Sequence, residues 1–312
     1  MSESESNYYE IFDISNVESD ILEQLGTKSK FWYLSENEEF LFKSVKSNTG
    51  DRIGDDWAEK ISCELARLLG LPHAHYELAI HKGVRGVITK NFISERGEQL
   101  MLGNELLEAF VVSPEGDNPN IQFIDDVHKI MNGVIINKPI GFSSLPSIKT
   151  ASDFFVGYLM FDALIANQDR HNENWGTIIT LKGLKHLAPS YDHGASLARN
   201  VNDQEKFDRM NSKDKGQQIS AFVLKARSCF LERNVINQKK RLKLIDAFRE
   251  YALMEKVAAK AWLKILSDLK DDHVKLVIDK VPEMLMSQVS KDFTYKLILC
   301  NKANLLAVNS DL

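Results

Sequence analysis

Hydrophobic and polar positions along the first third of the chain predict two β-hairpins with one helix between them. Residues 31–46 contain two aromatic and apolar runs joined by Ser35–Glu38, which is the pattern of a hairpin. Tyr76–Ile80 and Val84–Ile93 predict a second hairpin. Between the hairpins, apolar side chains recur at helical spacing from Asp55 to Gly70, so we expect a helix there, capped by one of the aspartates at its start.

Helical periodicity dominates the rest of the chain. Thr150 and Asp153 have the spacing of a capping box, and the apolar positions that follow predict a helix that ends just before Asn167. A short hairpin is expected around Lys182-Gly183, and residues 217–308 read as a succession of amphipathic helices. The second part of the chain is therefore predicted to be mostly α.

These patterns predict an α+β protein with two lobes. We expect residues 1–95 to form a small β-rich N-lobe with one helix, and residues 96–312 to form a larger, mostly α-helical C-lobe. The polar start of the chain contributes at most one strand, from its short apolar stretch near Tyr9.

Composition narrows the class of protein without naming a function. The chain has 312 residues, of which 44% are hydrophobic and 27% charged, as in an ordinary folded protein. Its formal net charge of -5 gives no basic footprint, so no direct nucleic-acid partner is expected. Cys63, Cys229 and Cys300 are far apart and show no C-x-x-C spacing, so they indicate neither a disulfide framework nor a zinc site.

Targeting signals are not evident. The first ten residues, MSESESNYYE, are polar and acidic where a secretory signal would be basic and then apolar, and no run of 18 apolar residues occurs. We therefore expect a cytoplasmic protein without a membrane partner. Delivery into another cell by a route other than Sec stays open, because its signal would not have this pattern.

The strongest chemical signal lies in NQDRHNENW, from Asn167 to Trp175, together with LAPSYDHG, from Leu187 to Gly194. Phosphoryl transfer from ATP needs a proton acceptor and hard oxygen ligands for Mg²⁺. Asp169, at the exit of a predicted helix, is placed to be the proton acceptor, and its spacing to Asn174 matches the catalytic loop of protein kinases. Asn174 and Asp192 are the candidate magnesium ligands.

Two neighbours of Asp169 have less certain roles. His171 could be a general base, a metal ligand or a residue that fixes the loop through its ring nitrogens, and we favour the last role. Arg170 either steers the substrate or is a solvated charge, so it is left out of the predicted site.

Candidate ATP contacts lie in the first lobe. Lys43, in the second strand of the first hairpin, could contact the phosphates, or simply face solvent. Glu59, on the following helix, could pair with Lys43, although it lies off the apolar stripe and its spacing to Asp56 also fits a capping box.

The remaining ATP contacts are predicted from position. Gly26, Thr27, Lys28 and Ser29 form the candidate phosphate-covering loop, which has neither a G-x-G-x-x-G nor a Walker pattern and could be a simple turn. The adenine is expected at the junction of the lobes, between Lys90 and Ile93, where backbone groups of Asn91 and Phe92 can form hydrogen bonds.

NQDRHNENW and LAPSYDHGAS resemble the HipA-like serine/threonine kinases, which are toxins of bacterial toxin–antitoxin systems. FLFK at Lys43, the helix with Glu59 and, more faintly, ITKNF at the lobe junction extend the resemblance over residues 26–200. It implies a protein-kinase fold, with Asp169 as catalytic base and Asn174 and Asp192 as ligands. The implied reaction uses ATP and Mg²⁺ to phosphorylate a protein, in some family members an aminoacyl-tRNA synthetase, so that translation stops.

The resemblance also implies partners. Many family members are held in check by a DNA-binding antitoxin, so an antitoxin-type regulator is expected. Longer members begin with a further N-terminal subdomain, for which residues 1–25 leave no room, and this chain looks like a short form whose missing piece is a separate small protein. The phosphate loop departs from the family's Ser-x-x-Gly-x-Gln-x-Lys type of pattern, which puts regulation by phosphorylation of its serine or threonine in doubt.

Two other functions fit part of the pattern. Phosphoinositide kinases also carry Asp-Arg-His-x-x-Asn followed by Asp-x-Gly, but the size of the chain and the lack of a basic membrane-facing stretch argue against a lipid kinase. A pseudokinase or interaction module would bind nucleotide without turnover. The weak glycine loop favours that alternative, whereas the intact set of Lys43, Asp169, Asn174 and Asp192 opposes it.

Overall fold

A computed structural model describes residues 7–17, 21–23, 28–47, 53–93, 97–111, 121–233 and 240–312. The first lobe is built on a six-stranded sheet in which only β1 and β5 run parallel. In sheet order the strands are β1 (Ile11–Asp13), β5 (Tyr76–His81), β6 (Val84–Lys90), β4 (Glu38–Ser47), β3 (Lys28–Ser35) and β2 (Ile21–Glu23).

Both predicted hairpins of the first lobe are present. β3 and β4 are joined by Glu36 and Asn37, whose positive φ angles of 52° and 65° are those of a tight turn that matches the twist of the strands. β5 and β6 form the second hairpin. Aromatic and apolar side chains of these strands pack into a small core of their own, made by Ile14, Phe31, Tyr33, Phe42, Ala79 and Ile88.

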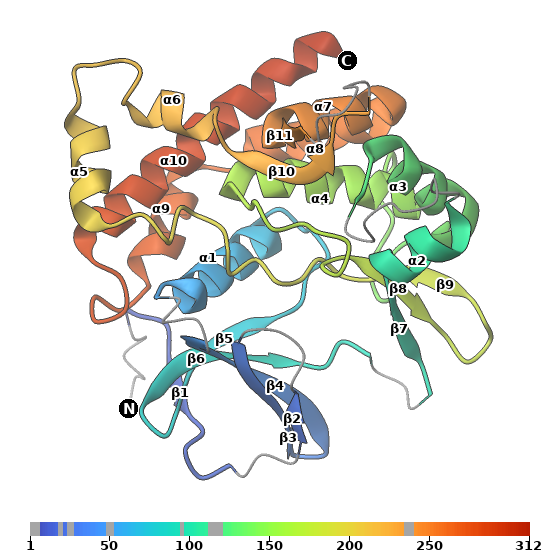
Figure 1. Cartoon of the computed structure of the whole chain (residues 1–312), viewed down its shortest axis with the longest axis horizontal. Coiled ribbons are helices and arrows are strands. Elements are labelled where there is room, and N and C mark those ends of the chain that lie inside the picture. Colours follow the sequence, from blue (N-terminus) through green and yellow to red (C-terminus); the bar gives the residue numbers. More distant parts are fainter. Residues whose placement is uncertain are drawn as a thin grey trace.

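Helix α1 (Asp55–Leu68) lies between this sheet and the helices of the second lobe (Figure 1). Its N-cap is Gly54, with φ 100° and no capping side chain, so the expected aspartate cap is wrong. Glycine is required at this position because a Cβ would come within 2.8 Å of the Trp57 ring. Asp56 instead forms an ion pair with Arg85 of β6, which ties the start of α1 to the sheet.

The second lobe is mostly helical and is organised around α4 (Ala151–Ile165), which is buried along almost its whole length. Thr150 and Asp153 form the predicted capping box. α4 packs against α7, α8 and α10. The helices of this lobe are α2 (Gly103–Phe110), α3 (Ile124–Ile130), the π-helical turn Met131–Ile135, α4, α5 (Asp203–Asn211), α6 (Ile219–Val223), α7 (Leu244–Met254), α8 (Lys256–Asp268), α9 (Asp271–Asp279), α10 (Gln288–Ala307) and the 3₁₀ turn Val308–Asp311.

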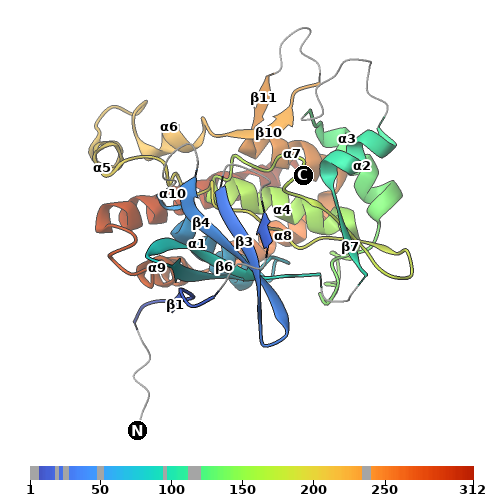
Figure 2. The same cartoon turned by 60° about the horizontal axis from the view of Figure 1, so that its bottom comes forward.

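Short strands complete the second lobe. The predicted hairpin around Lys182-Gly183 is formed by β8 (Gly176–Ile179) and β9 (Lys185–Leu187), and β7 (Gln99–Leu102) pairs with β8. The prediction of helices alone after residue 217 is wrong, because β10 (Arg227–Leu231) and β11 (Arg241–Lys243) form a further hairpin beside α7 (Figure 2). These strands are too short to show a clear two-residue period in the sequence.

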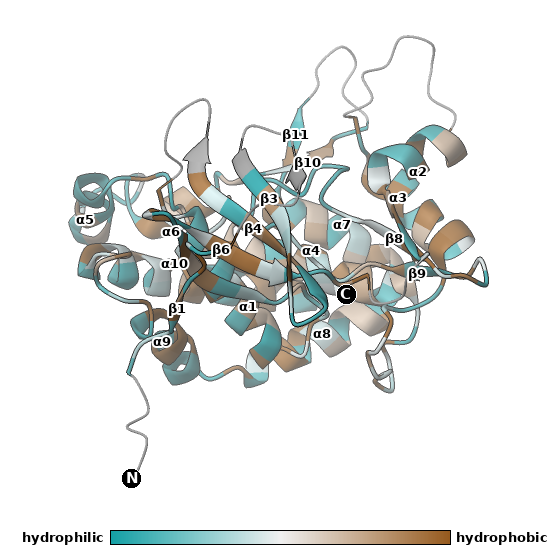
Figure 3. Cartoon of the chain, turned by 90° about the horizontal axis from the view of Figure 1, so that it is seen from below, coloured by the Kyte–Doolittle hydropathy of each residue, from teal (hydrophilic) through white to brown (hydrophobic). Residues whose placement is uncertain are grey.

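Helix α5 of the helical lobe is polar over most of its length. Figure 3 shows α5 as largely hydrophilic, and Lys206 is its one buried residue. Among the described residues, no helix has both the length and the apolar character needed to cross a bilayer.

Candidate active site

Lys43 lies on β4 at the centre of a group of polar side chains from both lobes. Its Nζ is 3.2 Å from Asp192 Oδ2 and 3.6 Å from Glu59 Oε1, and it donates a 3.5 Å hydrogen bond to the Tyr76 hydroxyl. Burial alone would lower the pKa of Lys43, but Asp192, Tyr76 and Glu59 outweigh that effect and raise the pKa well above its ordinary value. The solvent-facing alternative for Lys43 is therefore wrong, and the lysine stays positively charged.

Glu59 is part of the same group. Its side chain is only 1% exposed, and its Oε2 accepts a 2.8 Å hydrogen bond from the backbone N–H of His193. The structure thus brings Glu59 to Lys43, and the alternative capping role is wrong because Asp56 does not cap α1. Glu59 lies off the apolar stripe of α1, so its position in the sequence only weakly supported this role. In the structure the polar face of α1 is buried as well as the apolar face.

Asp169 follows α4 in a polar loop, as predicted. Its backbone N–H donates to Asn167 Oδ1 at 3.2 Å, and its backbone carbonyl accepts a 2.6 Å hydrogen bond from Asn174 Nδ2. The Asp169 side chain is 44% exposed, so its carboxylate faces outward while its backbone is held at both ends. An incoming hydroxyl can therefore reach this carboxylate without a rearrangement of the loop.

His171 and Asn174 shape that loop. His171 Nδ1 accepts a hydrogen bond from the backbone N–H of Glu173 at 3.2 Å, and the backbone carbonyl of His171 accepts one from Asn174 N at 2.9 Å. The Nε2 atom of His171 lies 3.9 Å from Asp169 Oδ1. This geometry suits the loop-fixing role expected of His171. Asn174 Nδ2 is committed to the loop, so Oδ1 is the atom that this residue can offer to a metal.

Arg170 has a role that the sequence did not reveal. Its side chain is 1% exposed, forms a bidentate ion pair with Asp162 of α4 and donates to the Ser190 hydroxyl at 2.8 Å. It also donates to the backbone carbonyls of Asn174 at 2.7 Å and Tyr191 at 3.4 Å. Arg170 is therefore neither a solvated charge nor a substrate contact, because it joins the Asp169 loop to the Asp192 loop from inside the protein.

The Asp192 loop is held in an unusual conformation. Asp192 has a φ of 57°, which is uncommon outside glycine, and its backbone N–H donates to the Tyr76 hydroxyl at 3.2 Å. The next residue, His193, is fully buried, and its Nε2 lies 2.7 Å from the Ser190 hydroxyl. Burial and the nearby positive charge of Arg170 lower the pKa of His193 well below its ordinary value, so the ring is neutral.

At the junction of the lobes, Asn91 and Phe92 follow β6 directly. Asn91 N donates to the Glu39 carbonyl at 2.8 Å, which fixes the junction to β4. The Phe92 ring stacks on Tyr191 with 5.6 Å between ring centroids, and the Tyr191 hydroxyl donates to the Glu173 carbonyl at 2.9 Å. Sequence analysis missed Tyr191, although its position directly before Asp192 was a usable signal.

The candidate phosphate loop is only partly described. Gly26 and Thr27 lie outside the described residues, whereas Lys28 and Ser29 begin β3. Lys28 and Ser29 are therefore part of a strand and not of a simple turn, and this part of β3 pairs with β4 and places Lys30 opposite Lys43. The candidate loop lies in the sequence between β2 and β3. β3 is the neighbour of β4, the strand that carries Lys43.

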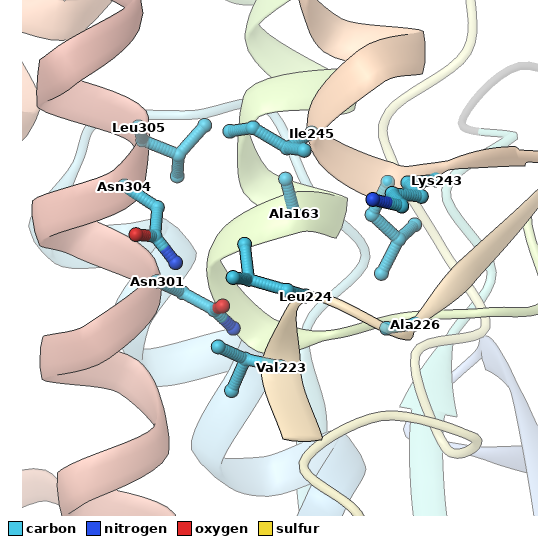
Figure 4. A pocket seen from close by; sticks show the side chains of 10 residues that line it. Ala163, Val223, Leu224, Ala226, Lys243, Ile245, Asn301, Asn304 and Leu305 are labelled. Carbon is cyan, nitrogen blue, oxygen red and sulfur yellow. The ribbon is translucent and has the colours of Figure 1, made fainter. Parts of the chain in front are cut away.

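A small cavity in the helical lobe does not belong to this site. It has a volume of about 10 Å³, enough for about one water molecule. Figure 4 shows side chains of α4, α6, α7 and α10 around it, among them Ala163, Val223, Ile245 and Asn301. None of the candidate catalytic residues lines this cavity.

Comparison with solved structures identifies the fold as that of the HipA-like protein kinases. The crystal structure of a Helicobacter pylori proinflammatory kinase, CtkA, matches with a TM-score of 0.76 and 19% identity, over 97% of this chain and 98% of that chain. A chain of the HipA–HipB–operator DNA complex of the Shewanella oneidensis MR-1 toxin–antitoxin system matches with a TM-score of 0.51 and 13% identity, over 96% of this chain and 67% of that chain.

The chain also resembles a CtkA protein in sequence. The serine/threonine-protein kinase CtkA of Helicobacter pylori strain J99 is 23% identical over 258 residues, which are 81% of this chain and 71% of that protein. No family model matches the chain. The chain shares the fold of CtkA, and that fold agrees with the two-lobed α+β architecture expected from the sequence.

Proposed function

We propose that this protein transfers the γ-phosphoryl group of ATP to a serine or threonine hydroxyl of another protein. The observation that carries the proposal is the position of Lys43, held between Glu59 and Asp192 beneath the junction of the lobes. The similarity to a serine/threonine-protein kinase supports a protein substrate over a lipid substrate.

Asp169 is the proposed catalytic base. Its exposed carboxylate can accept the proton of the substrate hydroxyl as that oxygen attacks the γ-phosphorus. Arg170 and Asn174 hold the backbone of the loop, so the carboxylate is oriented before the substrate arrives. Lys43 is the proposed contact to the phosphates, since its ammonium group stays charged and Glu59 limits its movement.

Asn174 and Asp192 fit Mg²⁺ by their donor chemistry, because an amide oxygen and a carboxylate are hard ligands. Asp192 already contacts one cation, the ammonium group of Lys43. When bound, Mg²⁺ supplies positive charge that neutralises the phosphate oxygens. The strained backbone of Asp192 keeps its carboxylate on the side of Lys43.

The rest of the nucleotide site is proposed from position. The backbone carbonyl of Asn91 and the backbone groups of Phe92 are proposed to contact the adenine, close to the stacked rings of Phe92 and Tyr191, because the Asn91 N–H is already bonded to Glu39. The segment with Gly26, Thr27, Lys28 and Ser29 is proposed to cover the phosphates, because it precedes the β3–β4 hairpin that carries Lys43. His171 is proposed to support the catalytic loop.

The resemblance to HipA-like toxins supports a more specific proposal for the substrate and a partner. We propose an aminoacyl-tRNA synthetase as the class of substrate, with inhibition of translation as the outcome. The matched HipA structure contains HipB and operator DNA. An antitoxin-type regulator is the partner we propose for this chain.

Incubation with radiolabelled ATP and Mg²⁺, followed by separation of proteins from lipids, tests the reaction class. Label in protein is expected for the wild type and not for Asp169→Asn. Label confined to lipid would overturn the proposal in favour of a lipid kinase, and ATP binding without any labelled product would favour a pseudokinase. Phosphoproteomics of cells that briefly express each form would then identify the substrate.

A further inference from the structure

The structure brings together three side chains that the catalytic proposal does not use. Cys63 of α1 faces His73 and His75, which belong to the segment that leads into β5. One ligand atom of each residue lies within 4.8 Å of the other two. His73 and His75 point the same way because side chains two apart in an extended chain share a face. Cysteine spacing gave no sign of this cluster, since its partners are histidines.

Both imidazoles are oriented by an oxygen acceptor on the side away from the cysteine. His73 Nδ1 donates to the Leu71 carbonyl at 2.7 Å, and His75 Nε2 donates to Glu77 Oε1 at 2.8 Å. His75 Nδ1 then faces Cys63 Sγ at 3.7 Å. A histidine that binds a metal typically donates its other N–H to a carboxylate or a carbonyl in this way.

We propose that Cys63, His73 and His75 bind one zinc ion. One thiolate and two imidazoles suit a tetrahedral zinc site with three protein ligands, and an exogenous ligand such as water takes the fourth position. Ligand atoms around zinc lie about 3.5 Å apart, given Zn–S and Zn–N bonds of about 2.3 and 2.0 Å. Cys63 Sγ and His75 Nδ1 are already 3.7 Å apart, and no two of the three ligand atoms are more than 4.8 Å apart, so shifts of about 1 Å bring the cluster to that spacing.

The state of Cys63 supports this assignment. Burial would raise the pKa of the thiol, but hydrogen bonds with His73 and His75 lower the pKa to about 6. The side chain is therefore largely the thiolate at neutral pH, which is the form that binds metals. The hydrogen bond with Cys63 raises the pKa of His75 to about 10, so His75 carries the proton that zinc displaces, and binding is expected to release a proton.

The cluster lies next to residues of the proposed kinase site, so a bound zinc ion would affect that site. Cys63 is one turn after Glu59 on α1, and His75 directly precedes Tyr76, whose hydroxyl contacts both Lys43 and Asp192. Ala74, between the two histidines, donates its N–H to the Ser190 carbonyl at 2.9 Å. A metal at this cluster would hold α1, the start of β5 and the Asp192 loop in one arrangement.

Cobalt is the probe for this site, because Co²⁺ takes the geometry of Zn²⁺ and absorbs visible and near-ultraviolet light. Full-length protein is freed of metal with a chelator and titrated with Co²⁺ in the absence of nucleotide and Mg²⁺. We expect thiolate-to-cobalt and tetrahedral bands that saturate at about one equivalent and disappear when Zn²⁺ is added. Zn²⁺ alone should also raise the thermal midpoint of the protein.

Variants locate the ion. Cys63→Ser is expected to lose the thiolate band, and His75→Ala to weaken metal binding by at least about tenfold. Cys300→Ser, which removes a cysteine of α10 far from the cluster, is the matched control and should bind as the wild type does. His75 is exposed, so His75→Ala keeps the test valid if Cys63→Ser fails to fold.

No cobalt bands in the wild type, or binding that survives both Cys63→Ser and His75→Ala, would overturn the proposal. The measurement needs no ATP and no substrate. Its outcome is therefore independent of the proposed kinase reaction.

Discussion

Arg170 and Asp162 form a buried bidentate ion pair, with both N–H···O distances at 2.8 Å. The pair joins α4, which ends just before the loop that carries Asp169, to the first residues of that loop. Because the same guanidinium group also bonds to Ser190 and to the carbonyls of Asn174 and Tyr191, it fixes the two loops that carry Asp169 and Asp192 relative to each other.

Arg170→Met should destabilise the protein by about 3–5 kcal/mol, because Asp162 is left as an uncompensated buried charge. Urea unfolding measures the change in the free energy of unfolding. Lys264→Met is the control, since Lys264 forms an exposed pair with Asp268 and its loss should change stability by no more than about 0.5 kcal/mol. A loss below about 1 kcal/mol in Arg170→Met would contradict the central role of this ion pair.

Asp169→Asn should reduce the rate of phosphoryl transfer by about 10²- to 10⁴-fold while ATP binding stays nearly unchanged. The amide keeps the size of the side chain but cannot accept the hydroxyl proton. Single-turnover rates and ATP calorimetry separate the two effects. Loss of ATP affinity in parallel with the rate would show that Asp169 acts in binding instead.

Glu59→Gln should lower kcat/KM by about 100-fold, because Lys43 loses the carboxylate that positions it. Steady-state kinetics over a range of ATP concentrations measures the change. Glu64→Gln is the matched control on the same helix, as Glu64 contacts Lys60 and Arg67 instead of Lys43. Equal losses in the two variants would mean that the effect comes from disturbance of α1 and not from the Lys43 pair.

Asp192→Ala should weaken ATP binding in the presence of Mg²⁺ by at least about tenfold and remove its dependence on Mg²⁺. Calorimetry with and without Mg²⁺ gives both affinities. Asp208→Ala, at an exposed position of α5, should leave both affinities unchanged. If Asp192→Ala kept the full magnesium effect, Asp192 would not be a magnesium ligand.

Lys206 should make stability depend on pH in the alkaline range. Burial lowers the pKa of this lysine to about 8, and its Nζ donates to Ser290 at 2.8 Å. Between pH 8 and the unfolded value near 10.5, the unfolded chain binds a proton that the folded protein does not, so the stability of the fold should rise with pH.

Lys206→Met removes this titration. The difference in thermal midpoint between the variant and the wild type should therefore favour the variant most below about pH 8 and shrink as the pH rises towards 10.5. A difference that stays constant from pH 7 to 10 would contradict a depressed pKa for Lys206.

Local sequence signals predicted the parts of the fold and the site that depend on neighbouring residues. The hairpin turn at Glu36-Asn37, the Thr150 capping box and the spacing of Asp169 and Asn174 are all readable within a few positions. The competing capping role for Glu59 and the omission of Arg170 from the predicted site have one common reason. Each of these residues is charged, and its burial depends on partners far away in the sequence, His193 for Glu59 and Ser190 for Arg170.

The cluster of Cys63 with His73 and His75 shows the same limit. The H-x-H pair was visible in the sequence, but its orientation towards α1 depends on the chain that turns back at Gly70 and pairs with the Asp192 loop. β10 and β11 were not predicted because their sequences show no clear period of two. They are recognised as strands only by their pairing with each other.

Helix α1 contacts both the sheet of the first lobe and the helical core of the second lobe. Its charged residues contact the sheet at Lys43 and Arg85, whereas its apolar residues, Trp57, Ile61 and Leu65 among them, lie in the main hydrophobic core with α4 and α10. Further bonds join it to the large lobe, from Ser62 to Ser196 and from Asp55 to Arg199. Because one helix packs in both lobes, the 3.6 Å separation of Lys43 Nζ from Glu59 Oε1 reports how the sheet is seated against the core of the helical lobe.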